Sequence, residues 1–165
     1  MTLRLVLTRH AKSSWDDLTL SDFERVLNKR GQGAAKAIGA WISAQGYTPD
    51  AALCSAATRT RETLERSGLQ PETQFLDGLY HAGADKILSI AQGKGSGKTL
   101  MIVAHNPGIA EFAGRILQRT PQHPRFADYP SGATLVADFE AERWADLRFG
   151  AGTPLAFIVP RELTE

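Results

Sequence analysis

Apolar runs of strand length alternate with helix-like segments along most of the 165 residues, and this alternation constrains the fold more than any other feature. The strand-like runs are 3–8, 50–54, 73–76, 99–104, 133–139 and 155–159. The helical patterns are 30–45, 57–67, 84–91 and 108–117. Strands separated by helices favour an α/β fold, which we predict to be a three-layer α/β/α sandwich with a mostly parallel central sheet. The last two strands lack a helix-length connection, so one strand is expected to run antiparallel.

Capping and turn residues mark where these elements begin and end. Asn28 is placed to cap the first helix, and Gly46 and Gly68 are placed to end the first two helices. The segments 16–27, 93–97 and 120–130 are predicted to be loops, the first with a short helical turn and the second flexible. There is no internal repeat or dividing linker, so we expect one domain over residues 1–165.

Composition excludes several classes of function. A net charge of +1 exerts no overall attraction on nucleic acid or anionic membranes, and we expect neither as a partner. No segment approaches the roughly 20 apolar residues of a membrane span, and the first residues do not resemble a signal peptide, which predicts a cytoplasmic protein. The single cysteine, Cys54, lies in an apolar run and is expected to be a buried structural thiol.

Cationic and imidazole side chains follow three of the predicted strands. Arg9 and His10 end the first strand, Arg59 follows the second at a helix start, and His105 follows the strand 99–104. Ligands of open α/β sheets bind at the carboxyl ends of strands, and helix starts bind anions. Arginine suits phosphate, and neutral histidine is a nucleophile, so together these residues indicate phosphoryl transfer. Taken singly, each of them could equally be a surface charge or a helix cap.

Three segments resemble one known family. Residues 5–11 (LVLTRHA) resemble the strand and "RHG" signature of the histidine phosphatase superfamily, also called phosphoglycerate mutase-like. Residues 55–63 (SAATRTRET) resemble its "SPxxRAxxT" segment, and 103–107 (VAHNP) is similar to its second histidine motif. The short chain and residues 25–31 look most like small phosphohistidine phosphatases of the SixA type. Ala11 and Ala56 depart from the family, which usually has glycine and proline there.

The resemblance implies a role for each matching residue. His10 would attack phosphorus and become a transient phosphohistidine. Arg9 and Arg59 would hold the equatorial oxygens, and His105 would add a cationic donor. Three further residues are expected to contact substrate: Arg25, Lys12 and Ser13.

No metal or cofactor site is apparent in the sequence. The four histidines lack the spacing of metal ligands, and His81 and His123 are expected at the surface. Residues 93–99 (GKGSGKT) imitate a nucleotide-binding loop, but they have one residue too few and precede a strand rather than a helix. We therefore predict a phosphatase that uses neither a metal nor a cofactor.

One residue of the sequence is a candidate for the proton donor. The wider family places a carboxylic acid within a stretch that corresponds to residues 76–83, where this chain has Asp77 beside Gly78. Asp77 is either a displaced acid or, as the Asp-Gly pair favours, a turn residue. A weak acid would harm an alkyl phosphate more than phosphohistidine, because imidazole leaves as a neutral ring once it is protonated.

Three functions remain open at this point. The leading one is dephosphorylation of phosphohistidine in a protein, such as a phosphotransfer domain, recognised by the rim of the site at residues 12–17. Trp15 lies in this segment, either exposed for such a partner or packed in the core. The second is hydrolysis of small phosphomonoesters. The third, which is not enzymatic, is a phosphate-binding or interaction protein with an inactive site.

Overall fold

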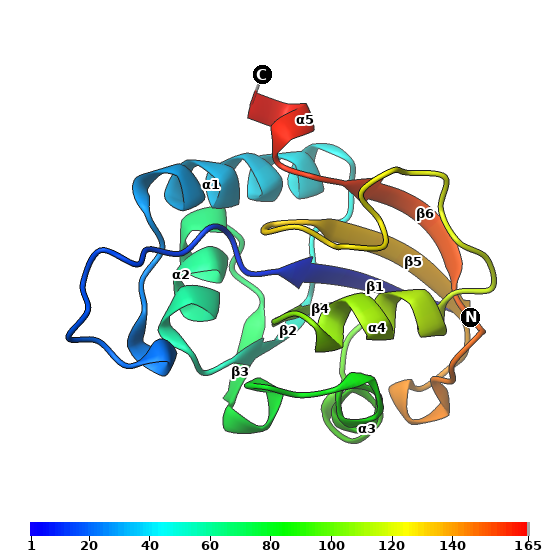
Figure 1. Cartoon of the computed structure of the whole chain (residues 1–165). Coiled ribbons are helices and arrows are strands. Elements are labelled where there is room, and N and C mark those ends of the chain that lie inside the picture. The colour runs from blue at the N-terminus through cyan, green and yellow to red at the C-terminus, as the bar shows by residue number, and fades with distance from the viewer. Residues whose placement is uncertain (165) are drawn as a thin grey trace.

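The computed structural model describes residues 1–164, which contain one six-stranded sheet with the order β3-β2-β4-β1-β5-β6 (Figure 1). Its strands are β1 (Thr2–Arg9), β2 (Ala51–Ser55), β3 (Glu72–Leu76), β4 (Thr99–Ala104), β5 (Thr134–Glu140) and β6 (Thr153–Ile158). Strands β1 to β4 are parallel, and β5 is antiparallel to both β1 and β6. The predicted sheet with one antiparallel strand is confirmed.

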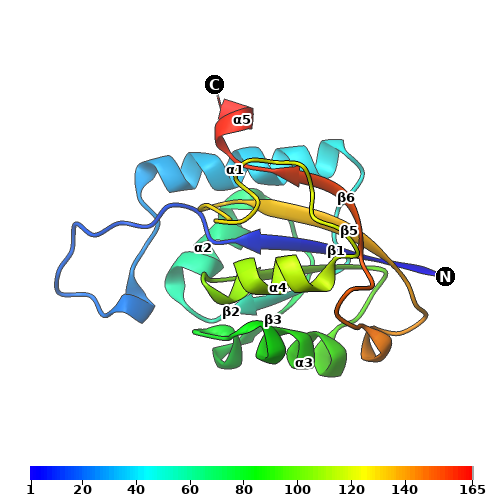
Figure 2. The ribbon, with the colours of Figure 1, turned by 45° about the vertical axis from the view of Figure 1, so that its right-hand side comes forward.

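Helices cover both faces of the sheet (Figures 1 and 2). They are α1 (Lys29–Ala44), α2 (Thr58–Ser67), α3 (Ala84–Lys94), α4 (Gly108–Ile116) and the short α5 (Arg161–Thr164). Alternate side chains of β1 point to opposite faces. Leu5 packs with residues of α3 and α4, whereas Val6 packs with residues of α1 and α2. Two buried apolar layers result, which confirms the three-layer sandwich.

Most local signals act as expected. The Asn28 side chain accepts a hydrogen bond from the Gly31 N–H at 2.8 Å, and Gly68 ends α2 with φ of 77°. Cys54 is fully buried in β2, where burial raises the pKa of its thiol to about 12. One expectation is wrong: α3 continues through Gly93 to Lys94, so the start of the predicted loop 93–97 is helical. The last turn is closed by the Gly95 N–H, which donates to the carbonyl of the buried Ala91 at 2.9 Å.

Three single-turn 3-10 helices complete the chain: η1 (Asp22–Glu24), η2 (Asp77–Leu79) and η3 (Trp144–Asp146). The segment 10–28, which contains η1, extends beyond the body of the molecule in both ribbon views (Figures 1 and 2). Within residues 1–164, no helix is both long and apolar enough to cross a membrane.

The sheet brings the predicted functional residues to one edge. Arg9 of β1 lies beside Ala104 of β4, and Cys54 of β2 lies beside Val103. Because these strands are parallel, the residues that follow them emerge at the same edge. His10 and His105 are therefore neighbours, although they lie 95 positions apart in the sequence.

Candidate active site

The predicted nucleophile, His10, follows the last residue of β1 and is 7% exposed. Its Nδ1 lies 2.7 Å from the carbonyl oxygen of Ala11. A carbonyl can only accept, so Nδ1 carries the ring proton and Nε2 keeps the lone pair. Burial lowers the pKa of His10 to about 3, despite an opposing effect of the hydrogen bond to Ala11. The ring is therefore neutral at pH 7, as a nucleophile must be.

Hydrogen bonds also hold the peptide after His10 against helix α2. The Ala11 N–H donates to Thr63 Oγ1 at 2.9 Å, and the Thr63 hydroxyl donates to the carbonyl of Arg59 at 2.7 Å. One chain of hydrogen bonds thus joins the ring of His10 to the helix that carries Arg59. Thr63 closes the motif 55–63, but nothing in the spacing of that motif indicates this linking role.

His105 lies against His10, with 5.3 Å between the ring centroids. Its Nε2 is 2.8 Å from the hydroxyl oxygen of Ser55, the last residue of β2. Burial, together with the positive charge of Arg59, lowers the pKa of His105 to about 4. The expectation of a cationic His105 is therefore wrong for the site as it stands, because desolvation and a neighbouring cation both oppose protonation.

Arg9 and Arg59 place two guanidinium groups at the same edge. Arg9 Nη1 donates to the carbonyl of Tyr129 at 3.2 Å, while burial and the charge of Arg59 lower the pKa of Arg9. Within residues 1–164, four buried side-chain polar atoms have no hydrogen-bond partner: Arg9 Nε, Arg59 Nε, His105 Nδ1 and Asn106 Oδ1. All four belong to the predicted site residues or the residue after His105. Clustered unsatisfied groups of this kind mark a place for a polar ligand.

Asp22 is the functional residue that sequence reasoning missed. Its carboxylate pairs with Arg59 Nη2 at 3.1 Å and with Arg25 Nη1 at 3.0 Å, and it accepts a hydrogen bond from the Tyr80 hydroxyl. These three partners hold the pKa of Asp22 well below its usual range, the Tyr80 hydrogen bond contributing most. A Ser21-x-x-Glu24 capping pattern marks this turn in the sequence, but it gives no sign of the contact with Arg59.

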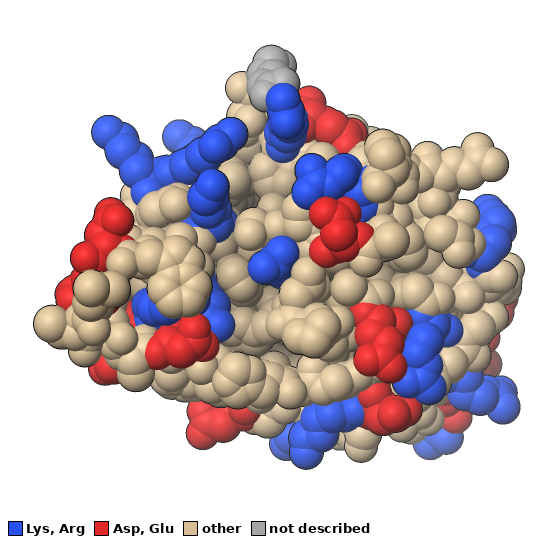
Figure 3. Space-filling model, in the orientation of Figure 1, with Lys and Arg blue, Asp and Glu red and all other residues tan. Residues whose placement is uncertain are grey.

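The predicted substrate contacts fall into two groups. Arg25 is 8% exposed and donates to the Ser13 hydroxyl and, at 3.1 Å, to the Ser14 carbonyl, so Arg25 and Ser13 meet. Lys12 is exposed and lines a cavity beside the beginning of α1, which neither Arg25 nor Ser13 lines. Lys and Arg side chains gather over that part of the surface (Figure 3).

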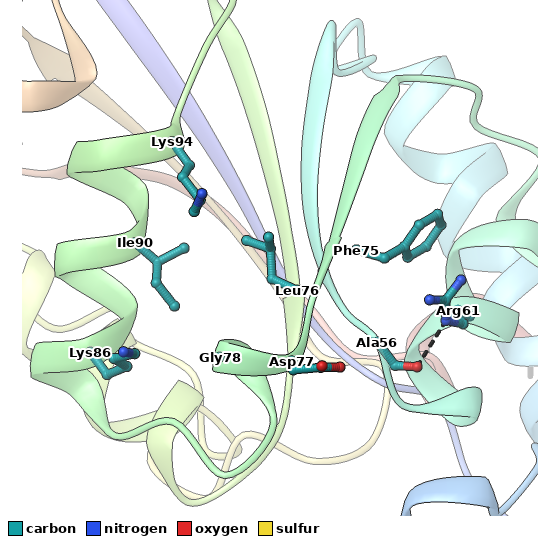
Figure 4. A pocket seen from close by; sticks show the side chains of 9 residues that line it. All are labelled: Ala56, Arg61, Phe75, Leu76, Asp77, Gly78, Lys86, Ile90 and Lys94. Atoms are coloured by element: carbon teal, nitrogen blue, oxygen red, sulfur yellow. Dashed lines mark hydrogen bonds between the residues drawn. The ribbon is translucent and has the colours of Figure 1, made fainter.

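Asp77 heads the turn η2 and is exposed. It lines a surface cavity of about 440 Å³ together with Arg61 and Lys86 (Figure 4). That cavity is bordered by β3 and α3, and neither His10 nor His105 lines it. The geometry accordingly matches the turn interpretation of Asp77 rather than that of a displaced acid.

The two other histidines differ in their surroundings. His123 is half-buried and bonds Glu162, away from the site. His81 is exposed as expected, but its ring centroid is 3.9 Å from that of Tyr80, and its charge lowers the pKa of His105. Within the described part of the chain, no three His, Cys, Asp or Glu side chains are grouped to hold a metal ion. A metal-free reaction stays a prediction.

Known proteins with similar sequences identify the family. The model of the histidine phosphatase superfamily (branch 1) matches residues 5–81. The uncharacterized protein Rv1276c of Mycobacterium tuberculosis is 31% identical over 159 residues, which cover 93% of this chain and 99% of the relative. The chain belongs to the histidine phosphatase superfamily. An uncharacterized protein of Mycobacterium leprae, ML1117, is 30% identical over 161 residues, again 93% of this chain and 99% of the relative.

Solved structures place the chain within this superfamily. A SixA-type protein from Nakamurella multipartitia is 26% identical, with a TM-score of 0.86 over 97% of each chain. The protein histidine phosphatase SixA in complex with tungstate has 19% identity and a TM-score of 0.77 over 98% of this chain and 100% of that chain, which shows a common fold. The chain is a SixA-like phosphatase, and the interpretation as an inactive binding protein is set aside.

Proposed function

We propose that this phosphatase removes the phosphoryl group from phosphohistidine in a protein, without a metal ion and with His10 as the transient acceptor. The observation that carries the proposal is a neutral His10 beside the unpartnered buried atoms of Arg9, Arg59 and His105. A buried polar group without a partner is costly. A phosphoryl group, rich in acceptor oxygens, would satisfy the two arginine N–H groups.

The reaction proceeds in two steps. His10 Nε2 bonds to phosphorus while the bond from phosphorus to the substrate imidazole breaks, and the imidazole, protonated on its other nitrogen, leaves as a neutral ring. Water then attacks phosphorus, the Nε2–P bond breaks, and its electron pair returns to His10. Both protons of the water leave with the product as H₂PO₄⁻.

The neighbours of His10 stabilise the charge in each step. Arg9, Arg59 and His105 hold the three equatorial oxygens, over which the charge of the transition state is spread. The rim residues Arg25, Lys12 and Ser13 contact the part of the substrate that leaves. Phosphoryl transfer depends mainly on such positioning, so no further catalytic group is required for the first step.

The carboxylate at the site favours phosphohistidine over an alkyl phosphate. Asp22 reaches Arg59, but Arg59, Arg25 and the Tyr80 hydroxyl keep it ionised. An ionised carboxylate cannot supply the proton that a departing alkoxide needs. The neutral imidazole leaving group does not need this proton, which makes small phosphomonoesters the weaker candidate.

The segment 10–28 favours a protein as the substrate. Trp15 is 70% exposed and Leu18 is 89% exposed, and the Arg25 guanidinium lies 3.2 Å from the centroid of the Trp15 ring. Exposed aromatic and aliphatic side chains beside a site are typical anchors of protein interfaces. Trp15 is thus outside the core, as recognition of a protein partner requires.

Transfer of labelled phosphate tests the proposal. A protein carrying ³²P-phosphohistidine is mixed with the enzyme and quenched in base within milliseconds to seconds. We expect an acid-labile label on the wild type and on His123→Asn, a control away from the site, and none on His10→Ala. Phosphohistidine protein is expected to react faster than a panel of small phosphomonoesters. A label that persists in His10→Ala, or preference for sugar phosphates, would overturn the proposal.

A further inference from the structure

A second cavity, of about 690 Å³, lies beside the candidate active site between the beginning of α1, the segment 125–131 and α5. No carboxylate among the described residues lines this cavity. Its lining includes five cationic side chains: Lys12, Lys29, Arg30, Arg125 and Arg161. We call it the basic groove. Lys and Arg atoms are seen to gather there, over the first half of α1 and around α5 (Figure 3). Ala34, Pro130 and Val159 give it an apolar component.

The basic groove lies next to the candidate active site. Lys12, which lines it, is two residues from His10. Ser131 lines it on the other side, and the next residue, Gly132, donates its N–H to the His10 carbonyl at 3.0 Å. A partner whose phosphohistidine reaches His10 would therefore lie across the groove.

Arg125 pairs with Asp128 at 2.8 Å, but among the described residues three other cations of the groove have no such carboxylate. Among residues 1–164, no carboxylate forms an ion pair with Lys12, Lys29 or Arg30. Lys29 and Arg30 occupy the first turn of α1, which carries no acidic residue. A helix start is itself positive and disfavours cations. In a chain with a net charge of only +1, this local excess points to an anionic partner.

We propose that the basic groove binds an acidic segment of the phosphorylated protein, next to its phosphohistidine. This inference rests on the proposed function, in which the substrate is a protein. All five cations are exposed, unlike the buried Arg59 that would bind the phosphoryl group. Exposed charges at a rim suit steering of a protein surface, whereas a small phosphate is held by buried, directed donors.

Binding of an unphosphorylated acidic peptide tests the groove without any chemistry. The probe is a fluorescent peptide of alternating glutamate and glycine, followed by anisotropy at low and high salt. The test variant is Lys29→Glu/Arg30→Glu, and the matched control is Lys86→Glu/Lys94→Glu at the cavity of Figure 4. We expect affinity to fall roughly tenfold or more in the test variant and to change less than about twofold in the control.

The test variant is expected to fold normally. Its new carboxylates occupy the first turn of α1, where negative charge is favourable, so its melting temperature should not fall. If the test variant and the control bind the peptide with equal affinity, the proposal is wrong. It is also wrong if the test variant loses binding of inorganic polyphosphate but not of the peptide. If the wild type binds the peptide but does not dephosphorylate phosphohistidine, the proposed function is wrong while the binding role of the groove stands.

Discussion

Replacing Thr63 with valine tests whether the hydrogen-bond chain from α2 orients His10. Valine has nearly the same shape, but it can neither accept from the Ala11 N–H nor donate to the Arg59 carbonyl. Thr63 is 2% exposed, so the N–H of Ala11 loses its partner out of reach of bulk water. An unpaired buried group costs about 1–3 kcal/mol. At about 2–4 °C per kcal/mol for a chain of this size, the melting temperature should fall by about 2–12 °C.

The kinetic effect follows from the other backbone group of the same residue. The carbonyl of Ala11 fixes the ring of His10 through Nδ1. Once the backbone of Ala11 is released from Thr63, the ring samples unproductive orientations, and displacements of about 1 Å can reduce a rate roughly 100-fold. We expect Thr63→Val to lower kcat on an aryl phosphate roughly 10- to 100-fold, with KM near that of the wild type.

Ser67 provides a matched control at the other end of α2. Its hydroxyl donates to the Leu64 carbonyl and accepts from the Leu69 N–H at 3.1 Å, the same two roles that Thr63 has. Ser67→Ala should lose similar stability and keep kcat, and Thr63→Ser should restore kcat. The reasoning is refuted if Thr63→Val is destabilised but keeps kcat, or if Ser67→Ala loses as much kcat as Thr63→Val.

Two further predictions concern charge. Because the folded-state pKa values of His10 and His105 are about 3 and about 4, below the ordinary 6.5, the unfolded chain takes up protons first as the pH falls. Between pH 6.5 and 4.5 these two groups should lower the free energy of unfolding by about 5 kcal/mol. In melts across this range, His10→Gln should reduce that fall by about 2–3 kcal/mol. If the free energy of unfolding of His10→Gln changes with pH as steeply as that of the wild type, the prediction is wrong. Asp22→Asn removes a carboxylate, 45% exposed, that occupies Arg59. The inhibition constant of orthophosphate as a competitive inhibitor should fall roughly 3- to 30-fold in this variant, allowing for solvent screening. A higher inhibition constant would show that Asp22 chiefly orients Arg59.

The sequence alone predicted the layers of the fold and the residues at one edge of the sheet. Hydrophobic periodicity is local, so α1, α2 and the buried strands could be recognised from their own residues. The rule that parallel strands end at one edge then placed Arg9, His10 and His105 together. The end of α3 was missed because glycines at 93 and 95 favour a loop locally, whereas in the fold the helix continues past the buried Ala91 to a closing hydrogen bond from the Gly95 N–H.

Only the tertiary structure decided the electrostatic state of the site. Asp22 meets Arg59 across 37 positions and Tyr80 across 58, and no local pattern encodes such contacts. The pKa values of His10 and His105 depend on how much water the packed chain excludes, which a single segment cannot determine. The basic groove likewise joins Lys12, α1 and α5, which meet only after the sheet forms. Residue identity thus pointed to His10 as the candidate nucleophile, whereas burial lowers its pKa and keeps the ring neutral, because desolvation is a property of the whole packed molecule.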